Sequence, residues 1–136
     1  MDVSSFQKSL QLAFPGLLGI EFIEITPERV VASMEARPNL SNNADMLHGG
    51  AMMAFADTLG AVATIVNLPK GARTTTIESK TNFLGAVATG QRIVGECTPF
   101  HRGRTTMVWQ TLVKSESGKL CAVVTQTQMV IPAGSA

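Results

Sequence analysis

The sequence predicts a single α+β domain in which one long buried helix is wrapped by a curved antiparallel sheet. The first observation is a nearly continuous apolar run from Ala51 to Val66, which is typical of a helix buried on most of its circumference. The second is the alternation of apolar and polar residues on both sides of this run, which indicates strands. The third is the order of these segments, β-β-α-β-β-β-β. The consecutive strands are joined by short connections, and short connections favour antiparallel neighbours. The 136 residues suffice for one such core and require no second domain.

The segments before the long helix are expected to form a short helix and a hairpin. Apolar residues near helical spacing predict an N-terminal helix over about residues 3–14, which Pro15-Gly16 is expected to end. The core of the domain is then expected to run over about residues 17–131. Alternation with a period of two predicts two antiparallel strands within residues 20–36, joined by a turn at Thr26-Pro27-Glu28.

The remaining elements follow from turn residues and alternation. A segment rich in loop formers leads to a helix from about Gly50 to Asn67, which Pro69-Lys70-Gly71 closes. Four further strands are expected near residues 73–84, 90–100, 104–115 and 119–131. Their connections are the stretches GAVATG, HRGR and SESGK.

Composition and charge exclude several classes of function. Eleven basic and ten acidic side chains give a net charge of +1 without a block of like charge, so nothing supports nucleic-acid binding. Cys97 and Cys121 form no CxxC pair, which predicts free thiols, no metal site and a reducing compartment. The N-terminus has no basic segment typical of a signal peptide, and the apolar run is short for a membrane span and contains Asp57. We therefore expect a cytoplasmic protein without membrane contact.

Asp57 is the one acidic residue in the apolar run. A buried carboxylate without a partner costs several kcal/mol, so such a residue is either satisfied locally or used in chemistry. The structural alternative is a hydrogen bond to a Ser or Thr hydroxyl. The functional alternative is a catalytic acid or base close to the His-Gly-Gly that precedes it.

The pattern N-x-x-x-x-L-H-G-G from Asn42 to Gly50, with an acid nine residues after His48, resembles the hotdog-fold acyl-CoA thioesterases. The resemblance is to the phenylacetic-acid-pathway (PaaI-like) branch in particular. The stretches TTTIESKTNFLGAV and GECTPFHRGRTTMVWQTLVKSESGKLCA are also similar, so the resemblance covers most of residues 17–131. A related aryl-CoA branch has Glu in place of Asp57 and Gln in place of Asn42, yet other stretches resemble that branch too. The acyl group is therefore left open.

The resemblance implies a homodimer in which two sheets join edge to edge, often assembled further into a homotetramer. Each active site would draw Asn42, His48 and Gly49 from one chain, and Asp57 with the hydroxyl of Thr76 from the other. The implied substrate is an acyl-CoA or aryl-CoA thioester. Coenzyme A would be part of the substrate, and no separate cofactor is implied.

These residue types suit thioester hydrolysis. Asp57 would act as general base or nucleophile, and a backbone N–H of Gly49 or Gly50 at the helix start would polarise the thioester carbonyl. Asn42 would orient the water, and His48 would order the loop or bind the substrate. Each has a structural alternative, because loop His and Asn often cap helices or form turns and Thr76 lies in a run typical of a strand.

The HRGR stretch is expected to bind the phosphates of coenzyme A through Arg102, Gly103 and Arg104, unless it is only a solvated turn. Two other functions stay open. A hydratase acting on enoyl-CoA would pair an Asp and a His five residues apart, whereas His48 and Asp57 are nine apart. A non-catalytic acyl-CoA sensor would keep the fold without the chemistry.

Overall fold

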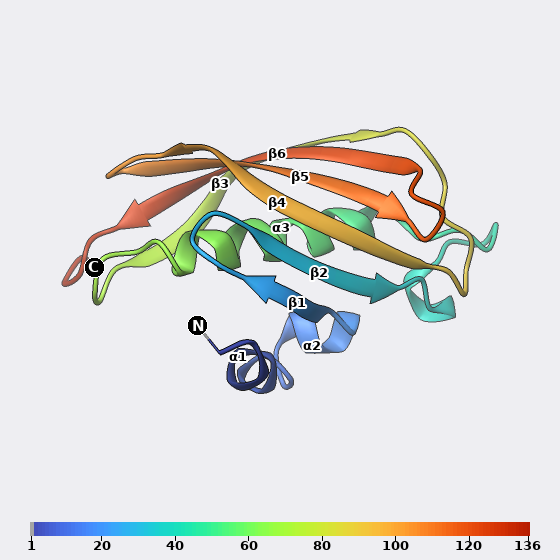
Figure 1. Cartoon of the computed structure of the whole chain (residues 1–136), viewed down its shortest axis with the longest axis horizontal. Coiled ribbons are helices and arrows are strands. Elements are labelled where there is room, and N and C mark those ends of the chain that lie inside the picture. Colours follow the sequence, from blue (N-terminus) through green and yellow to red (C-terminus); the bar gives the residue numbers. More distant parts are fainter. Residues whose placement is uncertain (1) are drawn as a thin grey trace.

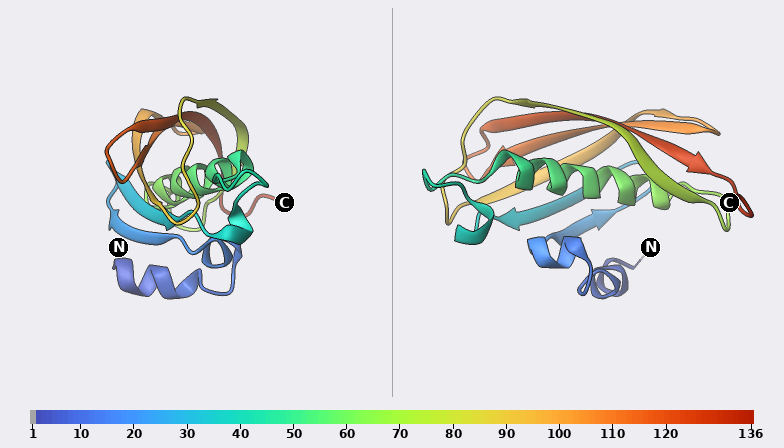
Figure 2. Two further views of the ribbon diagram at one scale, coloured as in Figure 1. Left: turned by 90° about the vertical axis from the view of Figure 1, so that its right-hand side faces the viewer. Right: turned by 180° about the vertical axis from the view of Figure 1, so that it is seen from behind.

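The computed structural model describes residues 2–136, and it has a six-stranded antiparallel sheet that curves around one central helix (Figures 1 and 2). This confirms the predicted α+β architecture. In chain order the elements are α1 (Val3–Ser9), α2 (Phe14–Leu18), β1 (Glu21–Ile25), β2 (Val30–Glu35), the 3-10 helix η1 (Pro38–Leu40), α3 (Gly49–Ile65), β3 (Arg73–Phe83), β4 (Arg92–Arg102), β5 (Thr106–Ser115) and β6 (Leu120–Ile131).

The core lies between α3 and the concave face of the sheet. Phe55 and Leu59 of α3 are fully buried against β4, where a Cβ at Gly95 would lie 2.6 Å and 2.9 Å from their side chains. The indole N–H of Trp109 donates to Thr64 Oγ1 at 2.8 Å and so ties β5 to the C-terminal half of α3. Inward-facing residues alternate with outward-facing ones along β5 and β6, as the sequence predicts.

The strand order is β1-β2-β4-β5-β6-β3, which places β3 at an edge of the sheet. The stretch GAVATG is therefore not a hairpin turn. Residues 84–91 instead carry the chain across the end of the sheet, and they lie beside the loop before α3 because Leu47 N–H donates to Val87 O at 2.8 Å. Val87 is 1% exposed, so this crossing is anchored in the core.

The N-terminal prediction is wrong in one respect. The first helix ends at Ser9, and Pro15-Gly16 lie inside the second helix, α2, instead of ending the first. Proline has no N–H and a fixed φ, so it fits the first turn of a helix, where no donor is needed. Gly19, with a φ of 73°, ends α2 in the left-handed conformation that glycine adopts readily. In Figure 1 both short helices lie below β1; α1 packs against β1, and α2 packs against α3.

Two boundaries differ from the expected ones in ways that affect the site. The long helix α3 begins at Gly49, with His48 as its N-cap, and ends at Ile65. In the HRGR stretch, His101 and Arg102 belong to β4, so the connection to β5 begins two residues later than predicted, at Gly103. Within residues 2–136 no helix is long and apolar enough to cross a membrane.

Candidate active site

Asp57 projects from the middle of α3 toward β3 and β6. The hydroxyl of Thr76 on β3 donates to Asp57 Oδ1 at 2.7 Å, and the side-chain amide of Gln126 on β6 donates to the same oxygen at 3.2 Å. Oδ2 accepts no hydrogen bond within residues 2–136, and it is not among the buried polar atoms that lack a partner. One oxygen of the carboxylate is therefore held and the other is open to solvent.

Sequence reasoning missed the two glutamines behind this carboxylate. Gln126 is 1% exposed and Gln128 is fully buried. Gln128 Nε2 donates to Thr76 Oγ1 at 2.6 Å, and the Thr74 hydroxyl donates to Gln128 Oε1 at 3.0 Å. The signal was present in the sequence, because residues two apart on a strand share a face and both glutamines share theirs with the buried Val124.

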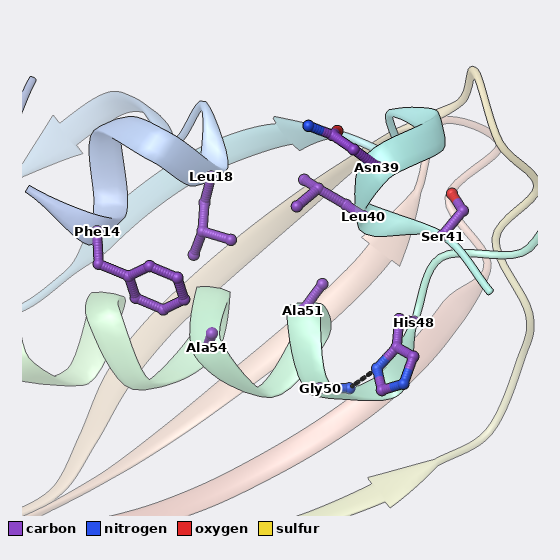
Figure 3. Close-up of a pocket in the computed structure, with 9 residues that line it drawn as sticks. All are labelled: Phe14, Leu18, Asn39, Leu40, Ser41, His48, Gly50, Ala51 and Ala54. Atoms are coloured by element: carbon purple, nitrogen blue, oxygen red, sulfur yellow. Dashed lines mark hydrogen bonds between the residues drawn. The ribbon is translucent and has the colours of Figure 1, made fainter.

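The start of α3 presents a free donor. His48 Nδ1 accepts the Gly50 N–H at 2.8 Å, as Figure 3 shows, so the histidine caps the helix. Gly49 N–H has no acceptor within residues 2–136. The backbone N–H groups of Gly49 and Gly50 were both predicted to donate to the thioester carbonyl. Of these two, the Gly49 N–H is therefore the one left available at the positive end of the helix dipole. Because Nδ1 is an acceptor, the proton of a neutral His48 ring lies on Nε2, which can still donate.

Asn42 has a structural role that its sequence context suggested. Its Oδ1 accepts the backbone N–H groups of Ala44 and Met46 at 2.9 Å and 3.2 Å, and the loop they form includes Asp45 at a φ of 56°. Its side-chain NH₂ has no acceptor within the part of the chain described. Asn42 and Gly49 line one pocket of about 420 Å³ on the β3 side of the helix start.

A second pocket of about 290 Å³ lies on the other side of the helix start, under α2. Figure 3 shows Phe14 and Leu18 of α2 opposite Ala51 and Ala54 of α3, with His48 at one end. Its lining is mostly apolar.

A single chain does not assemble all the predicted site residues. Asp57 and Thr76 lie together, and so do Asn42, His48 and Gly49, but Asp57 follows Gly49 by eight residues of continuous helix. That separation is about 12 Å along the helix axis. The two groups are therefore too far apart within one chain to act on the same carbonyl.

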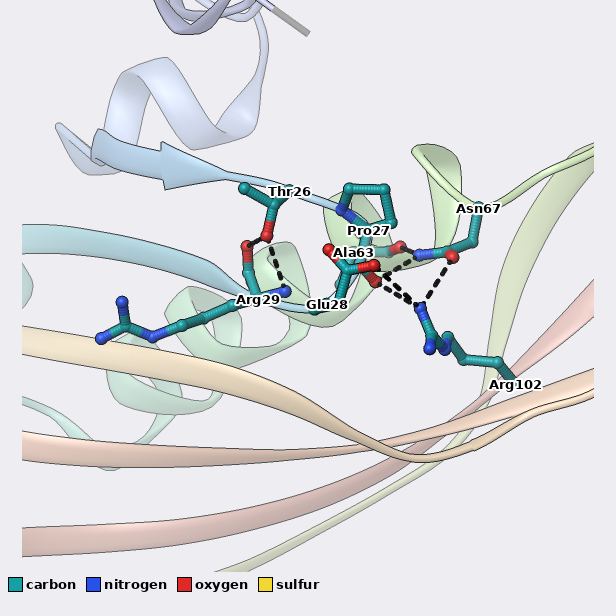
Figure 4. Close-up of polar contacts among 7 residues, drawn as sticks. All are labelled: Thr26, Pro27, Glu28, Arg29, Ala63, Asn67 and Arg102. Carbon is teal, nitrogen blue, oxygen red and sulfur yellow. Dashed lines mark hydrogen bonds and ion pairs between the residues drawn. The ribbon is translucent and has the colours of Figure 1, made fainter.

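The two arginines of the HRGR stretch have different surroundings. Arg102 Nη1 donates to Pro27 O at 3.1 Å and lies 3.8 Å from Glu28 Oε1 and 3.5 Å from Asn67 Oδ1 (Figure 4). It thus ties β4 to the β1–β2 turn and to the residues after α3. Arg104 has no hydrogen bond or ion pair within residues 2–136.

Arg104 and Gly103 line a pocket of about 330 Å³ together with Arg102 and Asn67. Gly103 sits in a crowded turn, because a Cβ there would lie 2.4 Å from His101 Nε2. Of the predicted phosphate ligands, Arg104 is the side chain that remains available.

Other candidate groups are engaged or inert. The hydroxyls of Thr58 and Thr64 donate to carbonyls one turn earlier in α3, so Thr76 supplies the hydroxyl beside Asp57. Burial raises the pKa of the Cys97 thiol to about 12, which leaves it protonated at neutral pH and unable to act as a nucleophile. Residues 2–136 contain no cluster of three or more side chains suited to a metal.

Comparisons with known proteins identify the family of this chain. The family model of the Thioesterase superfamily matches residues 44–122, which include the helix start, Asp57 and Thr76. The proofreading thioesterase EntH of Cronobacter turicensis is 32% identical over 104 residues, covering 76% of this chain and 75% of that protein.

Two solved structures are similar to this chain in fold. A thioesterase from Haemophilus influenzae is similar with a TM-score of 0.93 and 27% identity, covering 99% of this chain and 94% of its own. A Streptococcus mutans protein bound to acetyl-CoA is similar in fold, with a TM-score of 0.77 and 22% identity, covering 85% of this chain and 91% of its own. The chain therefore belongs to the Thioesterase superfamily, as a hotdog-fold member.

Proposed function

We propose that this protein hydrolyses acyl-CoA or aryl-CoA thioesters at active sites shared between two copies of the chain. The observation that carries the proposal is the pair of complementary half-sites: a carboxylate with one free oxygen at Asp57, and a free N–H at Gly49. Neither half can act alone on a thioester. The acetyl-CoA bound to the Streptococcus mutans protein of the same fold supports a CoA ester as substrate.

The edge strand β3 supports an assembly that joins these halves. It has eleven residues, within residues 2–136 it pairs only with β6, and Ile77 and Phe83 are more than half exposed on it. A long unpaired edge with exposed apolar side chains is a strand that a second chain can cover. We infer that β3 pairs with the β3 of a second copy, which makes one continuous antiparallel sheet.

The register of that pairing follows from distances within one chain. On β3, Thr76 lies beside Asp57, because its hydroxyl is 2.7 Å from Asp57 Oδ1. Phe83 lies beside Gly49, because a Cβ on Gly49 would be 3.1 Å from the Phe83 ring. A two-fold axis through Lys80, close to the midpoint, makes Lys80 face its own copy and brings the Asp57 level of one chain to within one residue of the Gly49 level of the other. The site then forms twice in each dimer. Assembly into a tetramer stays a prediction.

The proposed chemistry uses the two half-sites together. Gly49 N–H holds the thioester oxygen and stabilises its negative charge, helped by the helix dipole. Asp57 Oδ2 either takes a proton from the attacking water or attacks the carbonyl carbon itself. When water attacks, the C–S bond breaks to give the free acid, and coenzyme A leaves as the thiolate, which takes up the proton that Asp57 received. When Asp57 attacks, the same bond breaks and leaves a mixed anhydride, which water then hydrolyses to the free acid and the original carboxylate. His48 Nε2–H and the Asn42 NH₂ are the other donors at the helix start.

The proposed register predicts a specific cross-link. Lys80→Cys should form a disulfide between two copies under mild oxidation, because the residue on the two-fold axis of an antiparallel pair faces its own copy at about 4.5–5.5 Å between Cα atoms. Non-reducing electrophoresis measures the product. Arg73→Cys, at the far end of the same exposed strand, is the matched control. Equal cross-linking of both variants, or none at position 80 in an active protein, would show that the register is wrong.

Release of the free thiol of coenzyme A tests the activity and the role of the HRGR stretch together. We expect release from members of a panel of acyl-CoA and aryl-CoA esters. Arg104→Ala should raise KM for these esters by about 10-fold, the scale of one lost charge-assisted hydrogen bond, and change kcat less.

A truncated thioester without the nucleotide separates phosphate binding from other effects, because Arg104→Ala should leave its KM unchanged. Lys114→Ala, which removes an exposed cation elsewhere on β5, is the control variant. Binding of the esters without thiol release would favour the sensor instead. Equal KM changes for full and truncated substrates would exclude Arg104 from phosphate binding.

A further inference from the structure

We propose that Gln126 is a positioning residue, whose buried amide fixes the Asp57 carboxylate so that Oδ2 faces the substrate. This inference rests on the catalytic role proposed for Asp57. Gln126 Nε2 reaches two acceptors of the same residue, Asp57 Oδ1 at 3.2 Å and the Asp57 backbone carbonyl at 3.3 Å. It therefore binds the side chain and the helix backbone of Asp57 as one unit.

The direction of these hydrogen bonds follows from the carboxylate. An ionised carboxylate only accepts, so Gln126 must present its NH₂ group and Thr76 must donate its hydroxyl proton. With its hydroxyl proton directed at Asp57 Oδ1, Thr76 Oγ1 accepts from Gln128 Nε2. Gln128 Oε1 in turn accepts from the Thr74 hydroxyl, which also lies 2.9 Å from Met129 O. The hydrogen bonds thus run from Gln128 through Thr76 to Asp57, and the charge on Asp57 determines the orientation of the Thr76 hydroxyl and of the Gln128 amide.

Both donors act on the same oxygen. Rotation of a carboxylate about its terminal torsion is soft and exchanges the two oxygens, so a single hydrogen bond leaves its orientation loosely defined. Thr76 from β3 and Gln126 from β6 both hold Oδ1, and this leaves Oδ2 as the oxygen that is free to react. Two strands of the sheet therefore set the orientation of a group carried by the helix.

The packing around Gln126 favours this geometry at a cost in stability. A Cβ at Gly60 would lie 2.2 Å from Gln126 Cδ, so the amide fits only because α3 has a glycine one turn after Asp57. Glycine in a helix interior is less favourable than alanine. Gln126 Oε1 is also buried without a partner among the residues that the structure describes, which is unfavourable for a polar atom. A residue selected for stability alone would have neither feature.

Gln126→Met tests the proposal, because it keeps the length of the side chain and removes the donor. We expect kcat to fall about 10-fold with KM unchanged, since misplacement of a reacting group affects turnover more than binding. Gln110→Met is the matched control, the same change on the neighbouring strand β5, where alternation directs the side chain to the outer face. Gly60→Ala provides a second variant that displaces the amide without removing a polar group, and the same loss of kcat is expected.

A double-mutant cycle with Asp57→Asn separates positioning from general structural damage. Without the carboxylate there is nothing to orient, so Gln126→Met should lower the residual rate by less than about 2-fold in that background. The same 10-fold loss in both backgrounds would overturn the proposal, as would a normal kcat in Gln126→Met and Gly60→Ala. Full activity of Asp57→Asn itself would instead overturn the proposed function.

Discussion

Asp57→Asn is expected to lower kcat by at least about 10²-fold, the scale of a lost general base or nucleophile. The fold should be unaffected for a structural reason. An Asn carbonyl oxygen at the position of Oδ1 accepts the same hydrogen bonds from Thr76 and Gln126, and the amide nitrogen replaces the oxygen that has no partner. The change therefore removes the charge and the reactive oxygen but keeps the network.

Steady-state thiol release measures the turnover of Asp57→Asn, and thermal unfolding measures its stability. We expect KM within a few-fold of the unchanged protein and a similar melting temperature. If Asp57 had only a structural role, turnover would stay within a few-fold and stability would shift by about 1 kcal/mol. That outcome would remove Asp57 from the chemistry.

Gly49→Pro is expected to lower kcat by about 10²–10³-fold, as found when one donor to a developing oxyanion is lost. Proline removes the N–H of Gly49 without breaking α3, because Gly49 is the first residue of the helix. His48, which precedes it, already has the extended backbone that proline requires, with φ −63° and ψ 136°.

Gly49→Ala is the matched control for this variant. It keeps the N–H and adds a Cβ that would lie 3.1 Å from the Phe83 ring, so it reports the effect of crowding alone. We expect Gly49→Ala to retain much more activity than Gly49→Pro. Equal activity of the two variants would show that the N–H does not hold the thioester oxygen.

The sequence predicts most of the fold because its signals are local. The apolar run of α3 and the alternation along β5 and β6 directly report burial, and those elements lie within a few residues of their expected bounds. The errors occur where a residue has two structural uses. Pro15-Gly16 is typical of a helix end, yet proline equally suits the first turn of α2. The edge position of β3 depends on long-range pairing with β6, which local periodicity does not encode.

The sequence predicts some residues of the site and misses others for a similar reason. The family resemblance implied that Asp57 and Thr76 belong to the same chain's half of the site, and the two side chains are in contact within one chain. Gln126 and Gln128 were missed because glutamine in a strand is usually interpreted as exposed. Their burial becomes evident only with the partners that satisfy them. Arg102 was expected to bind phosphate, and its contacts come from a turn far away in the sequence.

The central claim is that one active site needs two chains, and subunit complementation tests it directly. Asp57→Asn and Gly49→Pro are each expected to be nearly inactive as pure proteins. A dimer with one copy of each variant keeps one site that has an intact Asp57 from one chain and an intact Gly49 from the other. Random mixing makes about half of the dimers mixed, each with one working site of two, so thiol release should return to about a quarter of the unmutated level. No recovery after verified subunit exchange would contradict the shared site.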